Sequence, residues 1–400
     1  MVYYTICIPT RNRQRYCIEA IKAIAASEET DFEVIVADNS DDPEIMRQFF
    51  KNEFSDSRFR LLPPRDRVLS MIDNWERTME EVTGRWVTFI GDDDHIDPRV
   101  IGLLRRYERE YKDVDTIGWS RMHYSWPDNR RRSTLAIVPC AHNTHIPSKQ
   151  TLQDRLYKWC ERKSRPSCGF GIYHGALRRS LMEKIKRKHN NRFFEHPTVD
   201  FENSCKVINL AKKLVYCQRP FSVLGACAAS NSAVTQSMEV EKERVETFLK
   251  ELGDGMHHQG DDFPFSPFLP GLSILSGIAS TTWWYCSTYG MDKTGFEENF
   301  VHSAIDQCLA SRSIEEYDIK VAGLKIGFDR WQGGKWASLF DPPPFKPPKS
   351  VNSLSGVYGT SIYVRESAID VATPGDFYSF AESFVMPSEH VISDRRAFAA

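Results

Sequence analysis

The sequence predicts an α/β fold: a mixed, mainly parallel sheet flanked by helices, with a mostly helical C-terminal extension. Through the first hundred or so residues, short apolar runs alternate with stretches in which apolar residues recur at the spacing of a helix. This alternation is typical of a parallel sheet covered by helices on both faces. Polar clusters follow three of these runs, after Ile8, Ala37 and Ile90. Because ligands of such sheets bind beyond the carboxyl ends of the strands, the three clusters indicate one site.

The N-terminal part supplies four predicted strands and four predicted helices. Pro9 ends the first strand, and Pro43 begins the second helix, where its missing N–H costs nothing. Gly84 ends the third helix, and the strand that follows it is strongly apolar. The predicted strands cover residues 3–8, 32–37, 59–62 and 86–90, and the predicted helices cover 18–26, 44–50, 68–82 and 98–111.

The pattern changes in the middle of the chain. From about residue 238 it becomes mostly helical, as in residues 239–252, and Gly and Pro in residues 254–270 indicate a loop or linker. We therefore expect one domain over residues 1–235 and a helical or irregular extension over 236–400, whose last fifty or so residues carry no readable pattern. The elements predicted between them are strand 169–173, helices 179–189 and 200–211, and strand 214–217.

Composition excludes several classes of protein. The formal net charge is −2 and no basic block dominates, so nucleic acid is not an expected partner. The ten cysteines are scattered without a Cys-x-x-Cys pair, as in proteins of reducing compartments. The N-terminus shows no signal peptide, and no apolar run reaches the roughly 18 residues of a transmembrane segment. We expect a protein of the cytoplasm or of the inner face of a membrane.

The strongest chemical signal is Gly91-Asp92-Asp93-Asp94 at the end of an apolar strand. Three adjacent carboxylates repel one another unless a positive charge lies beside them. Their hard oxygen atoms favour magnesium, manganese or calcium, and such an ion can bridge a diphosphate and stabilise its charge as it leaves. The alternative is a solvated acidic turn that caps the helix beginning near Pro98.

Two further clusters suit a nucleotide. Hydroxyl, amide and guanidinium groups follow the first strand, where they fit a base or a phosphate, although a capped helix start with surface arginines explains them too. Asp38 follows the second strand and can accept a hydrogen bond from a uracil-like imide or a ribose hydroxyl, but Asp and Asn also favour turns. The first cluster consists of Pro9, Thr10, Arg11, Asn12 and Arg13.

In order and spacing these residues resemble family-2 glycosyltransferases, which have the GT-A (Rossmann-like) fold. The opening strand and Pro-Thr-x-Asn-Arg of that family are similar to residues 8–13, and its Val-Asp-Asn/Asp-x-Ser-x-Asp segment to residues 36–41. Its amide-bearing helix is similar to residues 71–75, and its apolar run into Asp-x-Asp to residues 84–94. The resemblance covers roughly residues 1–235, and implies a nucleotide-sugar-binding catalytic domain there.

The resemblance implies roles for the residues that match the family at the first two strand ends. Thr10, Arg11 and Asp38 would line the nucleoside pocket, with the rest of residues 9–13 beside the donor. Asn74 would contact the donor or order the loop near it.

For the acidic residues the resemblance implies contacts with the sugar, the metal and the acceptor. Asp92 and Asp93 would touch the ribose and the sugar, and Asp94 together with Asp92 would hold Mn²⁺ or Mg²⁺. A carboxylate that opens a later helix would act as base, with Asp200 the first choice and Glu202 the second. The alternative is that both merely favour the dipole of the first helical turn.

Two positions depart from the family pattern. The family often carries a His near the end of the domain, where residues 219–232 contain none; Ser230, Asn231 or Ser232 would then be the hydrogen-bond donors. Position 37 is Ala where an acidic residue is common, so recognition of the base is expected to differ.

The resemblance implies an inverting glycosyltransferase with a divalent metal, active in polysaccharide or glycoconjugate synthesis. The donor would be a UDP-sugar first, with GDP- and dTDP-sugars also open, and the acceptor a glycan or glycoconjugate. Residues 236–400 would contribute to the acceptor site, a homo-oligomer contact or a membrane-surface contact. Two alternatives remain: a sugar-nucleotide nucleotidyltransferase, whose Gly-rich phosphate loop is missing here, and a catalytically silent carbohydrate- or nucleotide-binding module.

Overall fold

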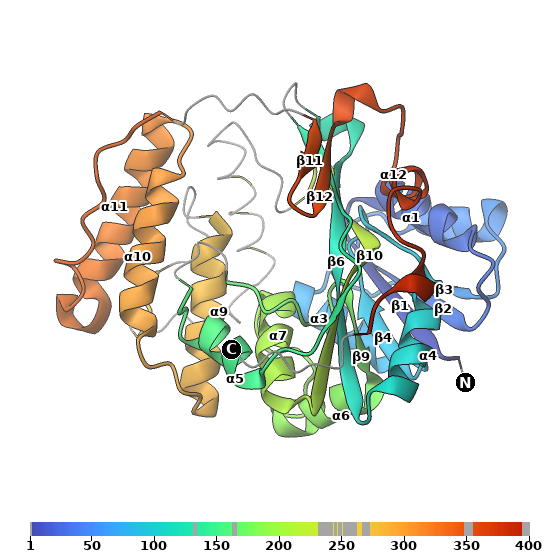
Figure 1. Cartoon of the computed structure of the whole chain (residues 1–400), viewed down its shortest axis with the longest axis horizontal. Helices are drawn as coiled ribbons and strands as arrows, with labels where there is room; N and C mark the ends of the chain where they lie inside the picture. Colours follow the sequence, from blue (N-terminus) through green and yellow to red (C-terminus); the bar gives the residue numbers. More distant parts are fainter. Residues whose placement is uncertain are drawn as a thin grey trace.

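The computed structural model describes most of the chain, in six segments and three single positions. The predicted fold class is confirmed: a mixed, mainly parallel sheet carries helices on both faces, and a helical region follows (Figure 1). The described residues are 2–130, 134–161, 166–230, 262–265, 273–347 and 355–393, together with 243, 246 and 250.

Within the described segments the strands form one twelve-stranded sheet with a main path of β11-β12-β7-β6-β9-β4-β1-β2-β3. Strand β10 pairs with β6 and also with the short strands β5 and β8. The bounds are β1 Tyr4–Thr10, β2 Phe32–Asp38, β3 Phe59–Leu61, β4 Trp86–Phe89, β5 His95–Ile96, β6 Val114–Ser125, β7 Leu135–Pro139, β8 Thr144–His145, β9 Gly175–Arg178, β10 Lys213–Ala226, β11 Gly356–Tyr358 and β12 Ser361–Arg365.

The first four strands place the predicted polar clusters at one edge. Strands β3, β2, β1 and β4 are all parallel, and the register pairs Thr10 with Asp38. Strand β4 lies on the other side of β1, with Cys7 opposite Phe89, so the loop of Asp92 begins beside the end of β1. The carboxyl ends of three neighbouring strands therefore meet at one place.

Alternate residues of these strands face two different helix layers. Ile6 and Val34 pack into the cluster that holds α1 and α4, whereas Cys7 and Ile35 pack into the cluster that holds α3, α6 and α7. Such strands, buried on both faces, are typical of parallel sheets. The helices of this part are α1 Gln14–Ala25, α2 Glu44–Gln48 with the π-helix Phe49–Glu53, α3 Met71–Glu80, α4 Val100–Glu110, α5 Lys149–Tyr157, α6 Arg179–Lys188 and α7 Val199–Leu210.

The middle of the chain differs from the prediction. Residues 169–173 are not a strand; Tyr173 alone forms a bridge, to Phe89, and the strand is β9, which begins at Gly175. The predicted strand 214–217 is the start of the much longer β10, whose register with β6 shifts near Pro220. Backbone conformation explains the first difference, because Gly169 and His174 both adopt positive φ angles, 73° and 53°, and interrupt extended structure.

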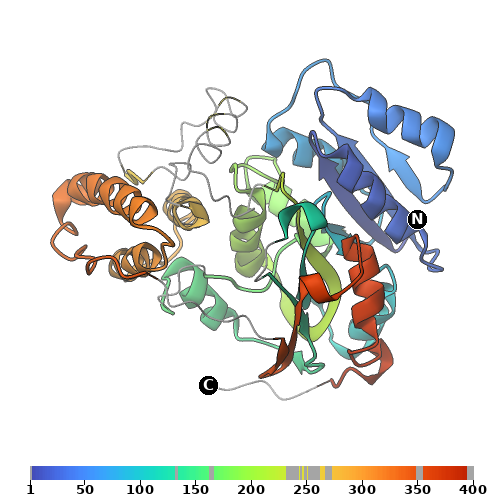
Figure 2. The same cartoon turned by 90° about the horizontal axis from the view of Figure 1, so that it is seen from above.

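The helical region is built around an aromatic core. Its helices α9, α10 and α11 lie together beside α5 and α7, away from the sheet (Figures 1 and 2). Phe300 and Trp331 are fully buried in this core, and their ring centroids lie 5.9 Å apart. The bounds are α9 Ser273–Tyr289, α10 Phe296–Leu309 and α11 Ile314–Arg330. The helix predicted over 239–252 and most of the loop predicted over 254–270 lie outside the described residues.

The last described part of the chain returns to the sheet. Strand β12 pairs with β7 in antiparallel fashion, and β11 pairs with β12 at the edge. Helix α12 (Pro374–Glu382) packs Phe377 and Tyr378 against residues of β6 and β10. This stretch, in which no pattern was readable, thus completes the sheet that carries the predicted site.

A search of the described helices for a membrane span gave a negative result: none combines the length and the apolar character required.

The aromatic core allows a test of stability. We expect Phe300→Ala to lower the free energy of unfolding by about 3–5 kcal/mol, the range for removing a buried Phe ring. Ile326→Ala is the control in the same region, because its side chain is 56% exposed, and we expect it to stay within about 0.5 kcal/mol of the wild type. Denaturant unfolding measures both variants, and equal effects would contradict this packing.

Candidate active site

Asp38 presents an unsatisfied acceptor at the end of β2. Its Oδ1 accepts a hydrogen bond from the backbone N–H of Ser40 at 2.9 Å. Its Oδ2 is buried and has no hydrogen-bond partner among the described residues. Burial raises the pKa of this carboxyl, and hydrogen bonds from Ser40 oppose the shift. A buried oxygen without a donor is costly, so Asp38 is suited to accept an N–H or O–H from a ligand.

The loops after β1 and β2 are tied to each other. Asn12, at a positive φ of 53°, donates from its backbone N–H to Ser40 Oγ at 2.7 Å. Its side-chain amide exchanges two hydrogen bonds with Asp41, at 2.8 and 3.0 Å, and Arg11 donates to the same carboxylate at 3.4 Å. Asn12 therefore shapes the loop around the strand ends, while Pro9 lies within β1 opposite Ala37.

Asn74 supports the same loop from below. Its side-chain N–H donates to the carbonyl of Ala37 at 3.1 Å, and its Oδ1 accepts from Arg77 Nε at 2.8 Å. Arg77 in turn donates to the carbonyl of Asp38 at 2.8 Å. Because Asn74 is buried with both ends of its amide occupied, it orders the loop.

Asp92 and Asp93 share one arginine. Asp92 is fully buried, and its Oδ2 accepts hydrogen bonds from Thr10 Oγ1 at 2.6 Å and from Arg13 Nε at 3.1 Å. A terminal nitrogen of Arg13 lies 2.7 Å from Asp92 Oδ1 in an ion pair. Arg13 also lies 3.7 Å from Asp93, which accepts from Ser230 Oγ and from the N–H of Cys227. Burial, reinforced by Asp93 and Asp94, raises the pKa of Asp92 to about 7 against the opposing charge of Arg13.

Ser230 was one of three predicted donors in the segment that departs from the family pattern. Its bond to Asp93 places it in the site. Asn231 and Ser232, the other two, lie outside the described residues.

Asp94 is saturated by protein donors. Its Oδ2 accepts from the N–H of Gly91 at 2.7 Å, from Tyr173 Oη at 2.6 Å and from His174 Nε2 at 2.8 Å. Its Oδ1 accepts from the N–H of Gly225 at 2.8 Å. Burial opposes ionisation, but His174, Tyr173 and Gly225 outweigh it and lower the pKa of Asp94.

The hydrogen bonds of His174 define its tautomer. The ionised carboxylate of Asp94 can only accept, so His174 Nε2 carries the imidazole proton and donates it to Asp94 at 2.8 Å. In the neutral ring Nδ1 is then the acceptor, and Ser222 Oγ, which accepts from Trp119 Nε1 at 3.0 Å, donates to it at 2.9 Å. Burial lowers the pKa of His174, which is consistent with a neutral ring. The sequence analysis singled out neither Tyr173 nor His174, because each meets Asp94 from about eighty positions away in the chain.

The three carboxylates do not fit a metal ion in this arrangement. The oxygens of Asp94 already accept four hydrogen bonds, and Asp92 is paired with Arg13 and Thr10. No group of three or more His, Cys, Asp or Glu side chains is placed to hold an ion anywhere in the described part of the chain. The positive charge that the acidic run was expected to need comes from Arg13.

Asp200 lies in the first turn of α7, within electrostatic reach of Tyr173. Burial raises the pKa of Asp200, and N–H groups of the helix start together with Arg121 of β6 oppose the shift. The residue is partly buried. Arg121 also acts electrostatically on His174, so a carboxylate and a guanidinium from distant segments meet beside the Asp94 network.

Glu202 is placed differently from Asp200. It is fully buried, and its carboxylate pairs with Lys206 at 2.5 Å. It also accepts from the backbone N–H groups of Glu195 and His196 at 2.9 to 3.1 Å. The pair with Lys206 lies within α7, and the N–H bonds tie α7 to the turn before it, so Glu202 positions the helix that carries Asp200.

Comparison with known proteins gives one family match. Residues 5–186 match the family model for glycosyl transferase family 2, and a search of curated proteins found no match. Among solved structures, the chain is similar to S. aureus TarS 1–349 in complex with UDP-GlcNAc, with 14% identity, 82% of this chain and 81% of that chain covered, and a TM-score of 0.43. It is also similar to S. aureus TarS, with 15% identity, 85% and 53% coverage, and a TM-score of 0.42.

The raised pKa of Asp92 gives a pH-dependent test. Unfolded, this carboxyl loses its proton near pH 4, whereas in the folded chain it keeps the proton up to about pH 7. The contribution of Asp92 to the stability of the wild type therefore falls across that window as the pH rises, and Asp92→Asn lacks this contribution. We expect the melting temperature of Asp92→Asn, relative to wild type, to increase from pH 4 to 7. Asp318→Asn, at an exposed position, should show a constant difference, and a constant difference for Asp92→Asn would refute the shift.

The saturated Asp94 gives a test with metal alone. We expect Mn²⁺ or Mg²⁺ without nucleotide to leave the melting temperature of the EDTA-treated protein unchanged, because an ion would have to displace existing hydrogen bonds. Differential scanning fluorimetry measures this. A rise with Mn²⁺ that disappears in Asp94→Asn would show that the carboxylate is available to a metal after all.

Proposed function

Because residues 5–186 belong to glycosyl transferase family 2, we propose that the protein moves a sugar from a nucleotide-sugar donor to an acceptor hydroxyl. The observation that carries this proposal is Oδ2 of Asp38, which is buried at the junction of three strand ends and has no hydrogen-bond partner within the described segments. Thr10 and the Asp92 loop lie at the same junction. Open α/β sheets bind nucleotides at such a place.

The donor we propose is a UDP-sugar. The imide N–H of uracil or a ribose hydroxyl would donate a hydrogen bond to Asp38 Oδ2. Arg11 lies in the neighbouring loop, directly after β1. GDP- and dTDP-sugars also carry N–H and O–H donors, so the nucleotide is a matter for the assay below. UDP-GlcNAc is bound in a structure of S. aureus TarS. For this chain, the support for a UDP-sugar comes from Asp38.

Asp200 is the base that we propose for the reaction. It removes the proton of the acceptor hydroxyl as that oxygen attacks the anomeric carbon, and the bond from that carbon to the diphosphate breaks on the opposite face. A single displacement of this kind inverts the anomeric configuration. Arg121 lies within electrostatic reach of Asp200 and favours its ionised form. Glu202 was the second choice, and the contacts of its carboxylate with Lys206 and two N–H groups support Asp200 over Glu202 for this part.

The acceptor we propose is a glycan or glycoconjugate, as in polysaccharide synthesis. Helices α7 and α9 are in contact, and Thr198, just before Asp200, is hydrogen-bonded to Thr281 of α9. The helical region thereby adjoins the end of α7 that carries the base, which supports a role for it beside the acceptor.

Asp200→Asn tests the assignment of the base. We expect turnover to fall by roughly two or more orders of magnitude, as for a lost general base, while the affinity for the nucleoside diphosphate stays unchanged. The wild-type rate should fall at acidic pH as Asp200 is protonated, above the ordinary Asp range because its pKa is raised, and the variant should lack this limb. The assay is donor hydrolysis and transfer over a panel of UDP-, GDP- and dTDP-sugars, with calorimetry for binding.

Asp318→Asn, which removes an exposed carboxylate of α11, is the matched control and should keep wild-type turnover. Full activity of Asp200→Asn would refute Asp200 as the base. A wild-type chain that neither binds nor cleaves any nucleotide-sugar would refute the proposed function as a whole.

A further inference from the structure

Arg121 of β6 is a partly buried cation for which the described residues supply no counter-ion. Across the described segments its guanidinium forms no hydrogen bond and no ion pair. A charge shielded from water without a partner has an energetic cost. Other shielded arginines have partners: Arg13 pairs with Asp92. Arg219 donates to the carbonyl of Met386 at 2.6 Å. The N–H groups of Arg121 are therefore available to a ligand.

The position of Arg121 in β6 directs its side chain to the face of the sheet that carries α7. Met122 and Tyr124 lie in one apolar cluster with Phe377 of α12. Successive residues of a strand point to opposite faces of its sheet. Arg121 therefore points away from α12, toward the side on which α7 and the helical region lie (Figures 1 and 2).

Arg121 lies beside both the proposed base and the network around Asp94. Its neighbour in β10 is Ser222, which is hydrogen-bonded to His174. Arg121 acts electrostatically on His174 and also on Asp200. Both Arg121 and Asp200 belong to the described segments, and they form no ion pair with each other. One ligand can therefore engage the two opposite charges together.

The chemistry of this pair favours an acceptor that carries an oxyanion. A hydroxyl of the acceptor donates to Asp200, whereas the guanidinium of Arg121 needs a negative group. Asp94 does not serve, because its oxygens already accept four hydrogen bonds. Carboxylates and phosphates match a guanidinium with two parallel hydrogen bonds, which neutral hydroxyls do not. The donor diphosphate leaves on the face opposite the base, so the oxyanion beside Asp200 belongs to the acceptor.

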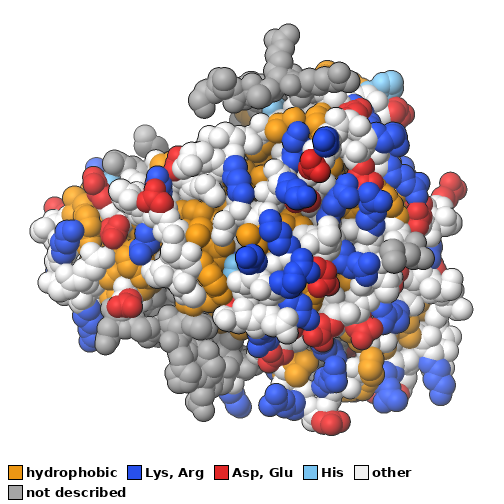
Figure 3. Space-filling view, turned by 90° about the horizontal axis from the view of Figure 1, so that it is seen from below, with side chains coloured by type: hydrophobic (Ala, Val, Ile, Leu, Met, Phe, Trp, Pro, Cys, Tyr) orange, Lys and Arg blue, Asp and Glu red, His pale blue; other side chains and the backbone are white. Residues whose placement is uncertain are grey.

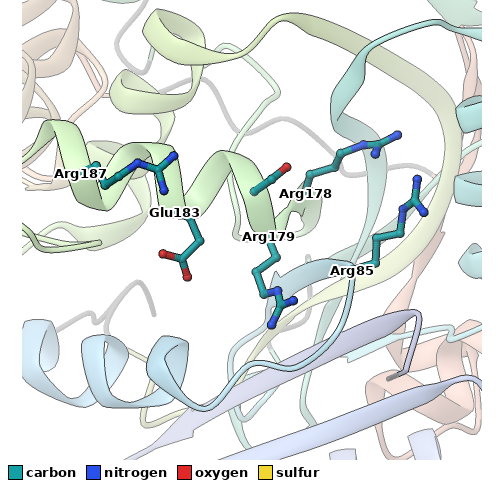
Figure 4. A pocket seen from close by; sticks show the side chains of 6 residues that line it. Arg85, Arg178, Arg179, Glu183 and Arg187 are labelled. Carbon is teal, nitrogen blue, oxygen red and sulfur yellow. The ribbon is translucent and has the colours of Figure 1, made fainter.

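Other basic surfaces of the protein lie away from the base. Lys and Arg side chains gather on the face seen in Figure 3, and four arginines surround a pocket of about 690 Å³ beside α6 (Figure 4). Glu108 pairs with two of these arginines, Arg85 at 2.8 Å and Arg178 at 2.9 Å. The pocket adjoins the start of β4, and Asp92 follows the other end of that strand. Its arginines are therefore suitable controls for anion binding outside the site.

We propose that Arg121 binds an oxyanion of the acceptor beside the attacking hydroxyl, so that the acceptor is an acidic glycan or glycoconjugate. This inference rests on the proposed function and narrows its acceptor to one chemical class. The oxyanion is the carboxylate of an acidic sugar or the phosphate of a phosphorylated sugar, and the same guanidinium receives it in either case.

Three probes with the same sugar ring test the proposal. Glucuronate and glucose 6-phosphate carry an oxyanion, and glucose is the neutral control. Ligand-observed NMR titration at equal ionic strength gives the dissociation constant of each probe. The test variants are Arg121→Gln, which removes the charge, and Arg121→Lys, which keeps the charge but lacks the paired N–H groups. The matched control is Arg187→Gln, at an exposed arginine of the pocket beside α6. Circular dichroism checks folding.

We expect the wild type to bind at least one oxyanion probe tenfold or more tightly than glucose, and the more tightly bound probe identifies the source of the oxyanion. Arg121→Gln should lose this preference, Arg121→Lys should keep part of it, and Arg187→Gln should keep all of it. If Arg121→Gln does not fold, the partial loss in Arg121→Lys decides. No preference in the wild type, or no greater loss at position 121 than in Arg187→Gln, would overturn the proposal.

Binding of the probes does not require donor turnover, so this inference and the proposed function are tested separately. Where the wild type cleaves a nucleotide-sugar, kcat/KM for transfer should be higher with the preferred oxyanion probe than with glucose. Arg121→Gln should abolish that ratio, which a general electrostatic effect on Asp200 would not change. Donor cleavage without any preference for an oxyanion would refute the inference alone. A preference for an oxyanion without binding or cleavage of any nucleotide-sugar would support the anion site and refute the proposed function.

Discussion

The site depends on the burial of Asp94. A carboxylate removed from water is costly unless donors replace the solvent, and here four protein groups from three parts of the chain do so. These bonds connect the end of β4 to β10 and to the turn before β9. Gly225 permits the contact, because a Cβ at that position would lie 1.7 Å from the carbonyl oxygen of Asp93. The carboxylate thus links the parallel half of the sheet to the half built from β6, β9 and β10.

Around Asp94, acidic side chains serve different purposes, depending on which hydrogen-bond donors and cations surround each carboxylate. Both oxygens of Asp94 accept hydrogen bonds and Asp92 forms an ion pair with Arg13, whereas the buried Oδ2 of Asp38 has no hydrogen-bond partner in the described part of the chain. Glu202 and Asp200 show the same contrast two positions apart, since Glu202 is fully buried in an ion pair with Lys206 whereas Asp200 is only partly buried. An acidic residue is free to act on a ligand only where the protein has not already used its oxygens.

This contrast explains how far the sequence could be used for prediction. Apolar runs and Pro or Gly boundaries located the first four strands closely, and the parallel pairing placed Thr10, Asp38 and Asp92 together. The strand predicted at 169–173 failed because Gly169 and His174 adopt positive φ angles at its two ends, and His174 forms its bonds to Asp94 and Ser222 with residues far away in the chain. Strands β11 and β12 were not predicted, since they are short and only their pairing with β7 stabilises them.

The acidic run shows why a motif alone does not define a cofactor site. Three adjacent carboxylates require positive charge or hydrogen-bond donors nearby, and a sequence does not say whether these come from an ion or from the protein. Here Arg13 stands three positions after Thr10, and both reach Asp92 from the loop that follows β1. The charge that the run requires is therefore supplied by the same loop that borders Asp38. The acidic residues and the loop form one electrostatic unit, because Arg13 pairs with Asp92 from the loop that borders the proposed nucleotide site at Asp38.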